Sequence, residues 1–262
     1  MAGADRPLAI LSAMPEEMTS LGAALDPAGD ATIAGFHFRH GQIDGHPVVL
    51  AEAGVGKVAA GLVTSLLLDR FNCSAVIFSG VAGRLDEELS LGDIVIGDEL
   101  IQHDYGALTG SRLKPYRPGM PPIGDNRDHP AFRLEPRLRE AIAEAIADLR
   151  LPAFTAGSAG AGGAAGRAVR VQLGRILTGD QFISSVATRD RLVREFKGQA
   201  VEMEGAALAQ VCERFNVPCV VVRCLSDRAG EDSHLDFAAF LAEAANLAAI
   251  VVRRLIPAVA KA

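Results

Sequence analysis

Short apolar runs without polar alternation recur along this 262-residue chain, and longer segments of helical period separate them. The runs are rich in Val, Ile and Leu, which is typical of strands buried on both faces of a sheet. The expected strands are Leu8–Ala13, Pro47–Ala53, Ser74–Ser79, Asp93–Gly97 and Pro218–Cys224. The expected helices are Lys57–Phe71, Glu135–Leu149, Glu202–Phe215 and Asp236–Leu255. This alternation predicts an α/β fold with a central mixed, largely parallel twisted sheet flanked by helices.

The composition restricts the classes of function. The chain has 26 basic and 32 acidic side chains, a net charge of −6, and 49% apolar residues, which excludes a collagenous or disordered chain. An acidic balance gives no basic stripe for a phosphate backbone, and two Tyr with no Trp offer little for stacking on bases. Nucleic-acid binding is therefore disfavoured. The length fits one α/β domain, and we expect a single domain over residues 1–262.

The four cysteines, at positions 73, 212, 219 and 224, form no CxxC pair and no spacing that suits zinc. We expect them to be single thiols in a reducing cytoplasm. The first residues, 1–7, lack the charged start and apolar stretch of a signal peptide, and the longest apolar window, Phe237–Ile256, contains Glu243, Arg253 and Arg254. We therefore expect neither export nor a membrane span.

Several Gly-rich or His-containing segments could suggest ligand sites, but their spacing does not support them. Tyr105–Asp128 and Ala156–Gly166 are predicted to be loops, and the second lacks the GxGxxG pattern of a nucleotide loop. Gly54–Lys57 is too short for a P-loop, so its glycines are predicted to permit a tight turn. His103-Asp104 lacks the spacing of a metal site, and no metal is expected.

Loops that follow strands are the places where an open α/β sheet binds ligands. After the first expected strand come Glu16 and Glu17, which favour the start of a helix, so capping is the preferred interpretation when this loop is considered alone. Ser79–Gly83 joins a strand to small residues, which suits a close approach to a ligand or a tight turn equally well.

Two further segments, Val201–Gly205 and Arg223–Asp227, together contain three acidic residues of interest. Glu202 and Glu204 would diverge on a helix, whereas in an extended segment they would share a face, with Met203 on the other. Asp227 ends the most apolar strand, and burial there would disfavour its charged form. It is either a helix cap or a proton donor.

With these residues assembled, the sequence resembles the nucleoside phosphorylase/nucleosidase superfamily, most closely its methylthioadenosine/S-adenosylhomocysteine nucleosidases. The matching segments lie in the family's order between residues 8 and 240, and Tyr105–Leu173 is the poorly matching stretch. We therefore expect a divergent, loop-rich insertion at about residues 105–172. The segments are LSAMPEEM, AGVGKVAAGL, SGVAGRLDEELSLGDIVI, TGDQFI, VEMEGAALAQVC and VPCVVVRCLSDRAGEDSHLDF.

The resemblance implies a role for each matching residue. Glu17 would activate the attacking water, Asp227 would donate a proton toward N7 of adenine, and Glu204 would hydrogen-bond to the ribose hydroxyls. The other candidate substrate-binding residues would surround the nucleoside. Met203 would pack along the sugar, Phe182 would stack on the purine and Ile183 would offer its backbone to the base edge. Arg223 and Ser226 would support the water and the aspartate, and Met14, Val81, Ala82, Gly83 and Glu202 complete the set.

The resemblance also implies an activity. It is hydrolysis of the N-glycosidic bond of 5′-methylthioadenosine or S-adenosylhomocysteine, without metal or cofactor, by a cytoplasmic homo-oligomer, a dimer in the family. Two departures leave details open. Family members often have a serine that holds the water where this chain has Val81, whose side chain can neither donate nor accept a hydrogen bond. The region after His103, which in relatives helps to build the 5′ pocket from the neighbouring subunit, differs in length.

Three alternatives remain open. A phosphorylase on the same fold would need positive groups beside the first loop, where Glu16 and Glu17 would instead repel phosphate, although Arg84 and Arg223 could bind it. A hydrolase could act on another purine nucleoside, such as aminofutalosine. A non-catalytic nucleoside-binding protein would keep Phe182 and Glu204 while losing the acid and the base.

Overall fold

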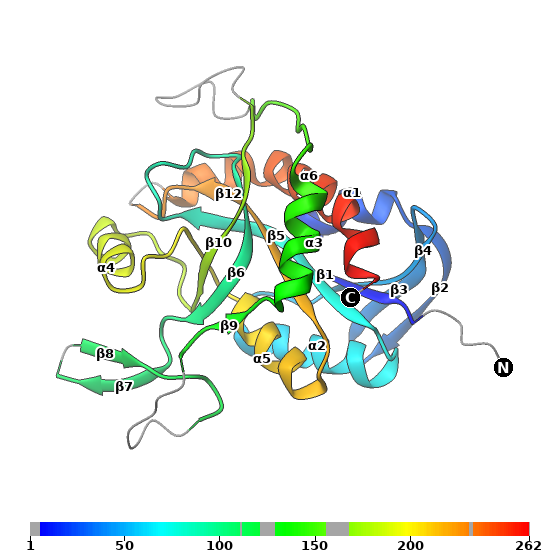
Figure 1. Ribbon diagram of the computed structural model, residues 1–262, viewed down its shortest axis with the longest axis horizontal. Helices are drawn as coiled ribbons and strands as arrows, with labels where there is room; N and C mark the ends of the chain where they lie inside the picture. The colour runs from blue at the N-terminus through cyan, green and yellow to red at the C-terminus, as the bar shows by residue number, and fades with distance from the viewer. Residues whose placement is uncertain (1–5, 111, 121–128, 156–167, 231–232, 262) are drawn as a thin grey trace.

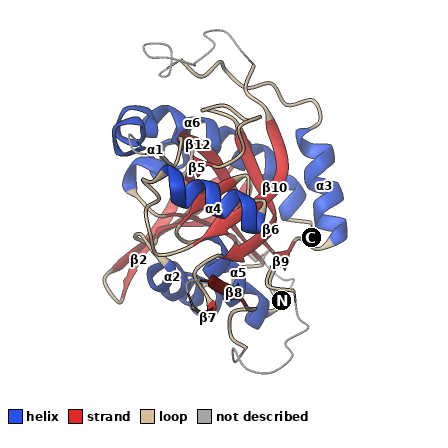
Figure 2. Ribbon diagram, turned by 90° about the vertical axis from the view of Figure 1, so that its left-hand side faces the viewer, coloured by secondary structure: helices blue, strands red, loops and turns tan. Residues whose placement is uncertain are grey.

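In the computed structural model, ten strands form one mixed sheet with helices on both faces (Figure 1, Figure 2). The structure describes residues 6–110, 112–120, 129–155, 168–230 and 233–261. The strands of the sheet are β1 (Leu8–Ser12), β2 (Asp26–Ile33), β3 (Phe36–Ile43), β4 (His46–Glu52), β5 (Ala75–Arg84), β6 (Ile94–Gln102), β9 (Phe132–Arg133), β10 (Val171–Thr178), β11 (Ala200–Glu202) and β12 (Cys219–Asp227). The helices are α1 (Pro15–Ala23), α2 (Lys57–Arg70), α3 (Pro136–Ile146), α4 (Val186–Phe196), α5 (Gly205–Phe215) and α6 (Ser233–Val259).

The strand order along the sheet is β11-β10-β6-β12-β5-β1-β4-β3-β2, and β9 pairs with β6. Parallel pairing joins β4, β1, β5 and β12, and a second parallel group contains β6, β10 and β11. The two groups meet where β12 runs antiparallel to β6. The predicted α/β class with a mixed sheet is confirmed.

Side chains that alternate along β1 divide the core into two layers. Leu8 and Ile10 point to the face that α1, α3 and α6 cover, whereas Ala9 and Leu11 point to the face that α2 and α5 cover. All five residues of β1 are buried, as a strand covered on both faces requires. Figure 2 shows the sheet between the two helical layers. A smaller apolar cluster packs α4 against the β10 end of the sheet.

The expected strands are all present, and three extend beyond the predicted ends. The longer ones are β5, β6 and β12, which continue into the small or polar residues where the apolar signal stops. The expected helices are also present, but the prediction that a helix starts at Glu202 is wrong. Glu202 ends β11, and α5 begins at Gly205. In addition, β2, β3, β9, β10, β11 and α4 were not among the predicted elements, and α1 was indicated only by the capping interpretation of Glu16 and Glu17.

The prediction of a loop over Tyr105–Asp128 is wrong in part. Gly106–Thr109 (β7) and Arg112–Pro115 (β8) pair as a separate two-stranded sheet. None of the eight strand residues is buried, so this hairpin lacks the apolar alternation that identifies a strand in sequence. The predicted loop Ala156–Gly166 lies outside the described residues.

Among the described residues, no helix is long and apolar enough to cross a membrane. The four cysteines are free thiols, and three of them, Cys73, Cys212 and Cys224, are buried.

Candidate active site

A cavity of about 380 Å³ lies at the carboxyl ends of the central strands, where α/β sheets bind ligands. Every candidate site residue predicted from the sequence lines it except Arg223, which lies behind its wall. The lining residues are Ala13, Met14, Glu17, Val55, Val81, Ala82, Gly83, Gln181, Phe182, Ile183, Val201, Glu202, Met203, Glu204, Ser226, Asp227 and Phe237. Segments separated by up to about two hundred residues in sequence therefore share one cavity.

Glu17 lies in the first turn of α1, which begins at Pro15, and its side chain folds back toward the end of β1. One carboxylate oxygen, Oε2, accepts hydrogen bonds from the backbone N–H groups of Ala13 and Met14, both at 2.9 Å. The other, Oε1, accepts from the Val81 N–H at 3.0 Å. Glu17 therefore caps its helix, as one interpretation of the sequence holds, and the same carboxyl group lines the cavity.

Glu17 and Arg223 approach each other over Gly80. A Cβ atom at Gly80 would lie 2.6 Å from Glu17 Oε1 and 2.8 Å from Arg223 Nη1, so the close approach of these two side chains requires glycine there. Burial raises the pKa of Glu17, and this effect outweighs the opposing influence of Arg223 and the three backbone N–H groups. A carboxyl group with a raised pKa is suited to accept a proton near neutral pH.

Glu202 is surrounded by protein donors. Thr178 Oγ1 donates to its Oε1. Its Oε2 accepts from the Gly205 N–H at 2.7 Å, from the Glu204 N–H at 3.2 Å, and from Arg223 Nη2 and Nε at 2.6 and 3.2 Å. The two backbone bonds explain why the helix starts after Glu202, because its side chain caps the first turn of α5.

Glu204 is the second carboxyl group beside Arg223. Its Oε1 accepts from the Gly56 N–H at 2.8 Å, and its Oε2 lies 3.6 Å from Arg223 Nη2. Glu202 and Glu204 therefore converge on one guanidinium, as an extended segment allows. Burial and then the nearby Glu202 raise the pKa of Glu204 to about 8, against the opposing effects of Arg223 and Gly56.

Arg223 connects these carboxyl groups from within the sheet. It stands on β12 with 1% of its surface exposed, and its guanidinium lies 4.1 Å from the centre of the Phe78 ring. Burial disfavours its charge, but Glu202, Glu204 and Glu17 together raise its pKa. One positive charge thus stands among three acidic side chains.

Asp227 ends β12, lines the same cavity and is 2% exposed. Its Oδ1 accepts from the Ala229 N–H at 2.9 Å, and its Oδ2 accepts from Ser226 Oγ at 3.1 Å. A Cβ atom at Gly83 would lie 3.0 Å from Oδ1, so the small residue on the paired strand makes room for the carboxyl group. These contacts fix the orientation of Asp227 toward the cavity that it lines.

Two aromatic rings close the apolar side of the cavity. Phe182 follows β10 and is 47% exposed, and Phe237 of α6 contacts it edge-on, with ring centres 5.9 Å apart and planes at 83°. Ile183 beside them is buried. Aromatic rings and carboxyl groups in one cavity suit a molecule with an aromatic base and a hydroxylated sugar.

Five lining residues were not among the sequence predictions: Ala13, Val55, Gln181, Val201 and Phe237. Two of them carried a usable signal. Val55 lies in the Gly54–Lys57 loop, which follows a strand and was interpreted only as a turn. Phe237 ends the last of the segments that carry the family resemblance.

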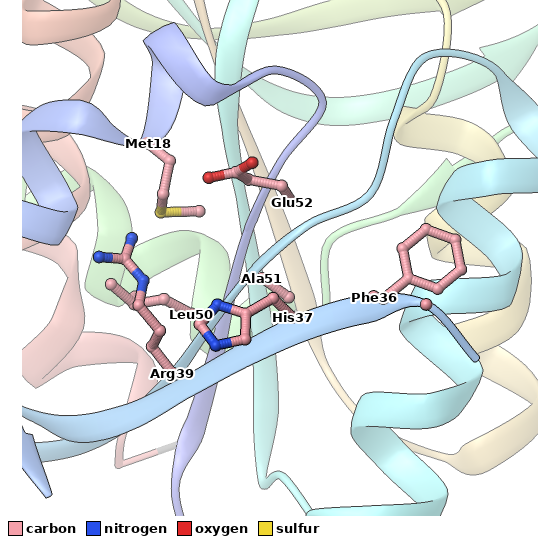
Figure 3. Close-up of a pocket in the computed structure, with 8 residues that line it drawn as sticks. Met18, Phe36, His37, Arg39, Leu50, Ala51 and Glu52 are labelled. Atoms are coloured by element: carbon pink, nitrogen blue, oxygen red, sulfur yellow. The ribbon is translucent and has the colours of Figure 1, made fainter. Parts of the chain in front are cut away.

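A second hollow, of about 230 Å³, lies between α1 and the β3–β4 hairpin (Figure 3). Figure 3 shows Met18, His37, Arg39 and Glu52 around it. Its one carboxyl group, Glu52, is exposed, and no candidate site residue lines it. It therefore lacks the paired buried acids of the larger cavity.

Comparison with known proteins gives consistent results. A family model described as "Phosphorylase superfamily" matches residues 7–257. A Mycobacterium bovis protein named 5′-methylthioadenosine/S-adenosylhomocysteine nucleosidase is 44% identical over 249 residues, which cover 95% of this chain and 96% of the relative.

Two solved structures are similar over almost their whole length. Futalosine hydrolase of Helicobacter pylori has a TM-score of 0.80 and 29% identity, and the match covers 97% of this chain and 98% of that one. A 5′-methylthioadenosine/S-adenosylhomocysteine nucleosidase of Colwellia psychrerythraea, in complex with adenine, has a TM-score of 0.80 and 33% identity, and covers 98% and 96%.

Proposed function

Since the chain belongs to the phosphorylase superfamily, we propose that it hydrolyses the N-glycosidic bond of a 5′-substituted adenosine and releases adenine. The substrates are 5′-methylthioadenosine and S-adenosylhomocysteine, which the names of its relatives specify. The observation that carries the proposal is the convergence of Glu17, Glu204 and Asp227, three buried acidic residues, on one cavity.

The reaction requires one group to protonate the leaving purine and another to activate water, as in glycoside hydrolysis. Asp227, in its protonated form, donates to N7 of adenine while the electron pair of the C1′–N9 bond passes to the purine. Glu17 takes a proton from the water that adds to C1′. Its raised pKa supports this role, because it favours proton uptake.

The sugar becomes positively charged in the transition state. Glu204 binds the ribose hydroxyls, and its carboxyl oxygens accept hydrogen bonds from them that strengthen as that positive charge develops. Met203 and Phe182 both line the cavity. Met203 packs against the sugar, and Phe182 stacks on the base. Glu202 acts indirectly, because its oxygens already bind Arg223 and the start of α5.

The charges at the site favour water over phosphate as the nucleophile. The described lining contains four carboxyl groups, Glu17, Glu202, Glu204 and Asp227, and no Lys, Arg or His. Arg223 is the cation behind them, and Glu202 and Glu204 already contact it. Arg84 donates to the Leu89 carbonyl and is not part of the lining. A phosphate dianion would find no free positive partner here.

A second substrate class is a purine nucleoside with a different 5′ group, such as aminofutalosine. The similarity to futalosine hydrolase, with a TM-score of 0.80, supports it. The two classes share the base and the ribose and differ at the 5′ position. A substrate panel that includes both classes separates them.

We also propose that the protein is a cytoplasmic homodimer. The four free thiols suit a reducing compartment. The outward face of α2 carries Val58 and Leu62, which are 83% and 45% exposed, close to Val55 at the cavity. Exposed apolar residues one helical turn apart are typical of a surface that a partner covers, and we assign it to a second copy of the chain.

The test of the catalytic proposal is adenine release from 5′-methylthioadenosine with and without phosphate. Glu17→Gln and Asp227→Asn should each lower kcat by roughly 10² to 10⁴ while the protein stays folded. Glu16→Gln and Asp190→Asn, at exposed acidic residues, are the matched controls and should keep full activity.

Two outcomes would contradict the proposal. Release that depends on phosphate and yields a ribose 1-phosphate would identify a phosphorylase. Tight binding of adenosine analogues without any base release would identify a nucleoside-binding protein.

A further inference from the structure

Three loops, each of which follows a different strand, meet at the side chain of Lys57. Lys57 Nζ lies 2.7 Å from Asp104 Oδ1 and 3.8 Å from Asp180 Oδ2. The backbone N–H of Lys57 donates to Asp180 Oδ1 at 2.8 Å, and the N–H of Asp180 donates to Asp104 Oδ2 at 2.9 Å. Lys57, Asp104 and Asp180, here called the Lys57 cluster, therefore connect the loops that follow β4, β6 and β10.

The Lys57 cluster adjoins two residues proposed to hold the nucleoside. Gly56, directly before Lys57, donates its N–H to Glu204 Oε1 at 2.8 Å. Asp180 lies two residues before Phe182, the proposed stacking surface for the base. Movement of the cluster would thus shift both the carboxyl group at the ribose and the ring at the purine.

The cluster differs from an ordinary surface ion pair. The side chains of Lys57 and Asp104 are only 18% and 21% exposed. Gly56, the residue that caps α2, has no side chain, and the first turn of α2 contains no acidic residue. Asp180, 123 residues away, supplies the missing acceptor for the start of the helix. The conformation of the Gly54–Lys57 loop therefore depends on the loop after β10.

The ionisation of Asp104 fits this arrangement. Burial alone would raise its pKa, but the Lys57 ammonium and the Asp180 N–H lower it. Asp104 is therefore charged at neutral pH and attracts Lys57. From the sequence, Gly54–Lys57 was predicted only to be a tight turn, and His103-Asp104 lacked the spacing of a metal site. In the structure, each of these two segments contributes a residue to the Lys57 cluster.

We propose that the Lys57 cluster positions Glu204 and Phe182 for nucleoside binding, so that Lys57, Asp104 and Asp180 are positioning residues of the active site. This inference rests on the proposed function, because it assumes that Glu204 and Phe182 bind the substrate. The cluster reaches Glu204 through Gly56, whereas Glu17 is held by the N–H groups of Ala13, Met14 and Val81. Loss of the cluster should therefore weaken binding more than the chemical step.

The kinetic test compares Lys57→Met with Lys57→Arg, which keeps the charge. Lys57→Met should raise KM for 5′-methylthioadenosine roughly tenfold, the usual scale for loss of a charge-assisted contact, while kcat changes less than about threefold. Lys57→Arg should recover most of the loss. Lys261→Met, at an exposed lysine near the end of α6, is the control and should match the wild type.

A second measurement, hydrogen exchange, tests the role of the Lys57 cluster in the absence of substrate. Hydrogen exchange of the Gly56 and Lys57 amides should accelerate in Lys57→Met, together with that of residues 179–183, while exchange in β1 stays unchanged. Asp180→Asn, a smaller change that keeps the side-chain shape, should give the same pattern if Lys57→Met folds poorly.

The proposal is overturned if exchange near Gly56 stays at the wild-type rate in both variants, or if it rises equally across the whole chain. It is also overturned if kcat falls as much as KM rises. The exchange result is independent of the proposed function, which fails separately if the wild-type protein releases no adenine.

Discussion

At the scale of single residues, the candidate site contains buried acidic side chains with different partners. Glu202 accepts two hydrogen bonds from Arg223, at 2.6 and 3.2 Å, whereas Glu204 lies 3.6 Å from it. The pKa of Glu204 is correspondingly raised, to about 8. Two glutamates separated by a single residue thus have different partners.

This difference predicts how stability depends on pH. The pKa of Glu204 is about 8 when folded, against an ordinary value of 4.5, so its contribution to the free energy of unfolding is full below pH 4.5 and is lost as pH rises through 8. Glu204→Gln removes this ionisation. Its thermal midpoint should equal that of the wild type at low pH and exceed it at alkaline pH, by about 2–4 °C for each kcal/mol.

The measurement is a set of thermal unfolding curves between about pH 5 and pH 9 without substrate. Glu16→Gln, which changes an exposed glutamate, is the control. Part of the slope should remain in Glu204→Gln, because burial also raises the pKa of Glu17. A constant difference between the two proteins at every pH would contradict the raised pKa of Glu204.

The family resemblance implied roles for Glu17, Glu204 and Asp227, but the sequence did not indicate what holds these side chains in place. Glu17 and Asp227 each follow an apolar strand, a pattern that alone also fitted helix capping. Lys57 carries no such signal, because its partners lie 47 and 123 residues away. Only the tertiary fold brings those residues together.

At the scale of elements, the junction between β11 and α5 depends on one carboxylate. Glu202 ends the strand, caps the helix and pairs with buried Arg223. The sequence predicted the helix correctly except for its start, because the strand before it has only three residues. A strand that short gives no periodicity, and here it exists through its pairing with β10 and β5.

We predict that Glu202→Gln is strongly destabilising. It leaves Arg223 with less opposing charge in a dry environment, which costs about 3 kcal/mol for a buried pair. Urea unfolding measures the change. Glu195→Gln is the matched control, because Glu195 forms a surface pair with Arg191 at 3.3 Å and should change stability by less than about 0.5 kcal/mol. Equal stability of the two variants would show that the buried pair contributes little.

Two of the missed strands, β2 and β3, share a physical cause. The edge strand β2 (Asp26–Ile33) has no buried residue, and β3 (Phe36–Ile43) has only two. Polar, exposed segments of this kind become strands through backbone pairing with a neighbour, which composition does not reveal. The expected central strands were predictable because their residues are apolar, and apolar runs indicate burial.

At the scale of the whole molecule, the exposed face of α2 predicts association. Val58→Asp should convert a homodimer into monomers in sedimentation or light scattering, because it places a charge in an apolar contact. Its thermal midpoint under monomeric conditions should stay unchanged, since Val58 is 83% exposed within one chain. Val186→Asp, which changes a 40% exposed valine on α4, is the control and should remain dimeric. A wild-type protein with the mass of one chain would contradict the prediction.

The position of β12 also affects how the chain folds during its synthesis. This strand is the last in sequence, yet it lies between β5 and β6 in the middle of the sheet. During synthesis, β5 and β6 leave the ribosome more than a hundred residues before the strand that joins them. Until then their facing edges have unpaired N–H and C=O groups, which other chains can bind. The nascent protein should therefore depend on chaperones at this stage, and no truncated product that ends before Asp227 can be an active enzyme.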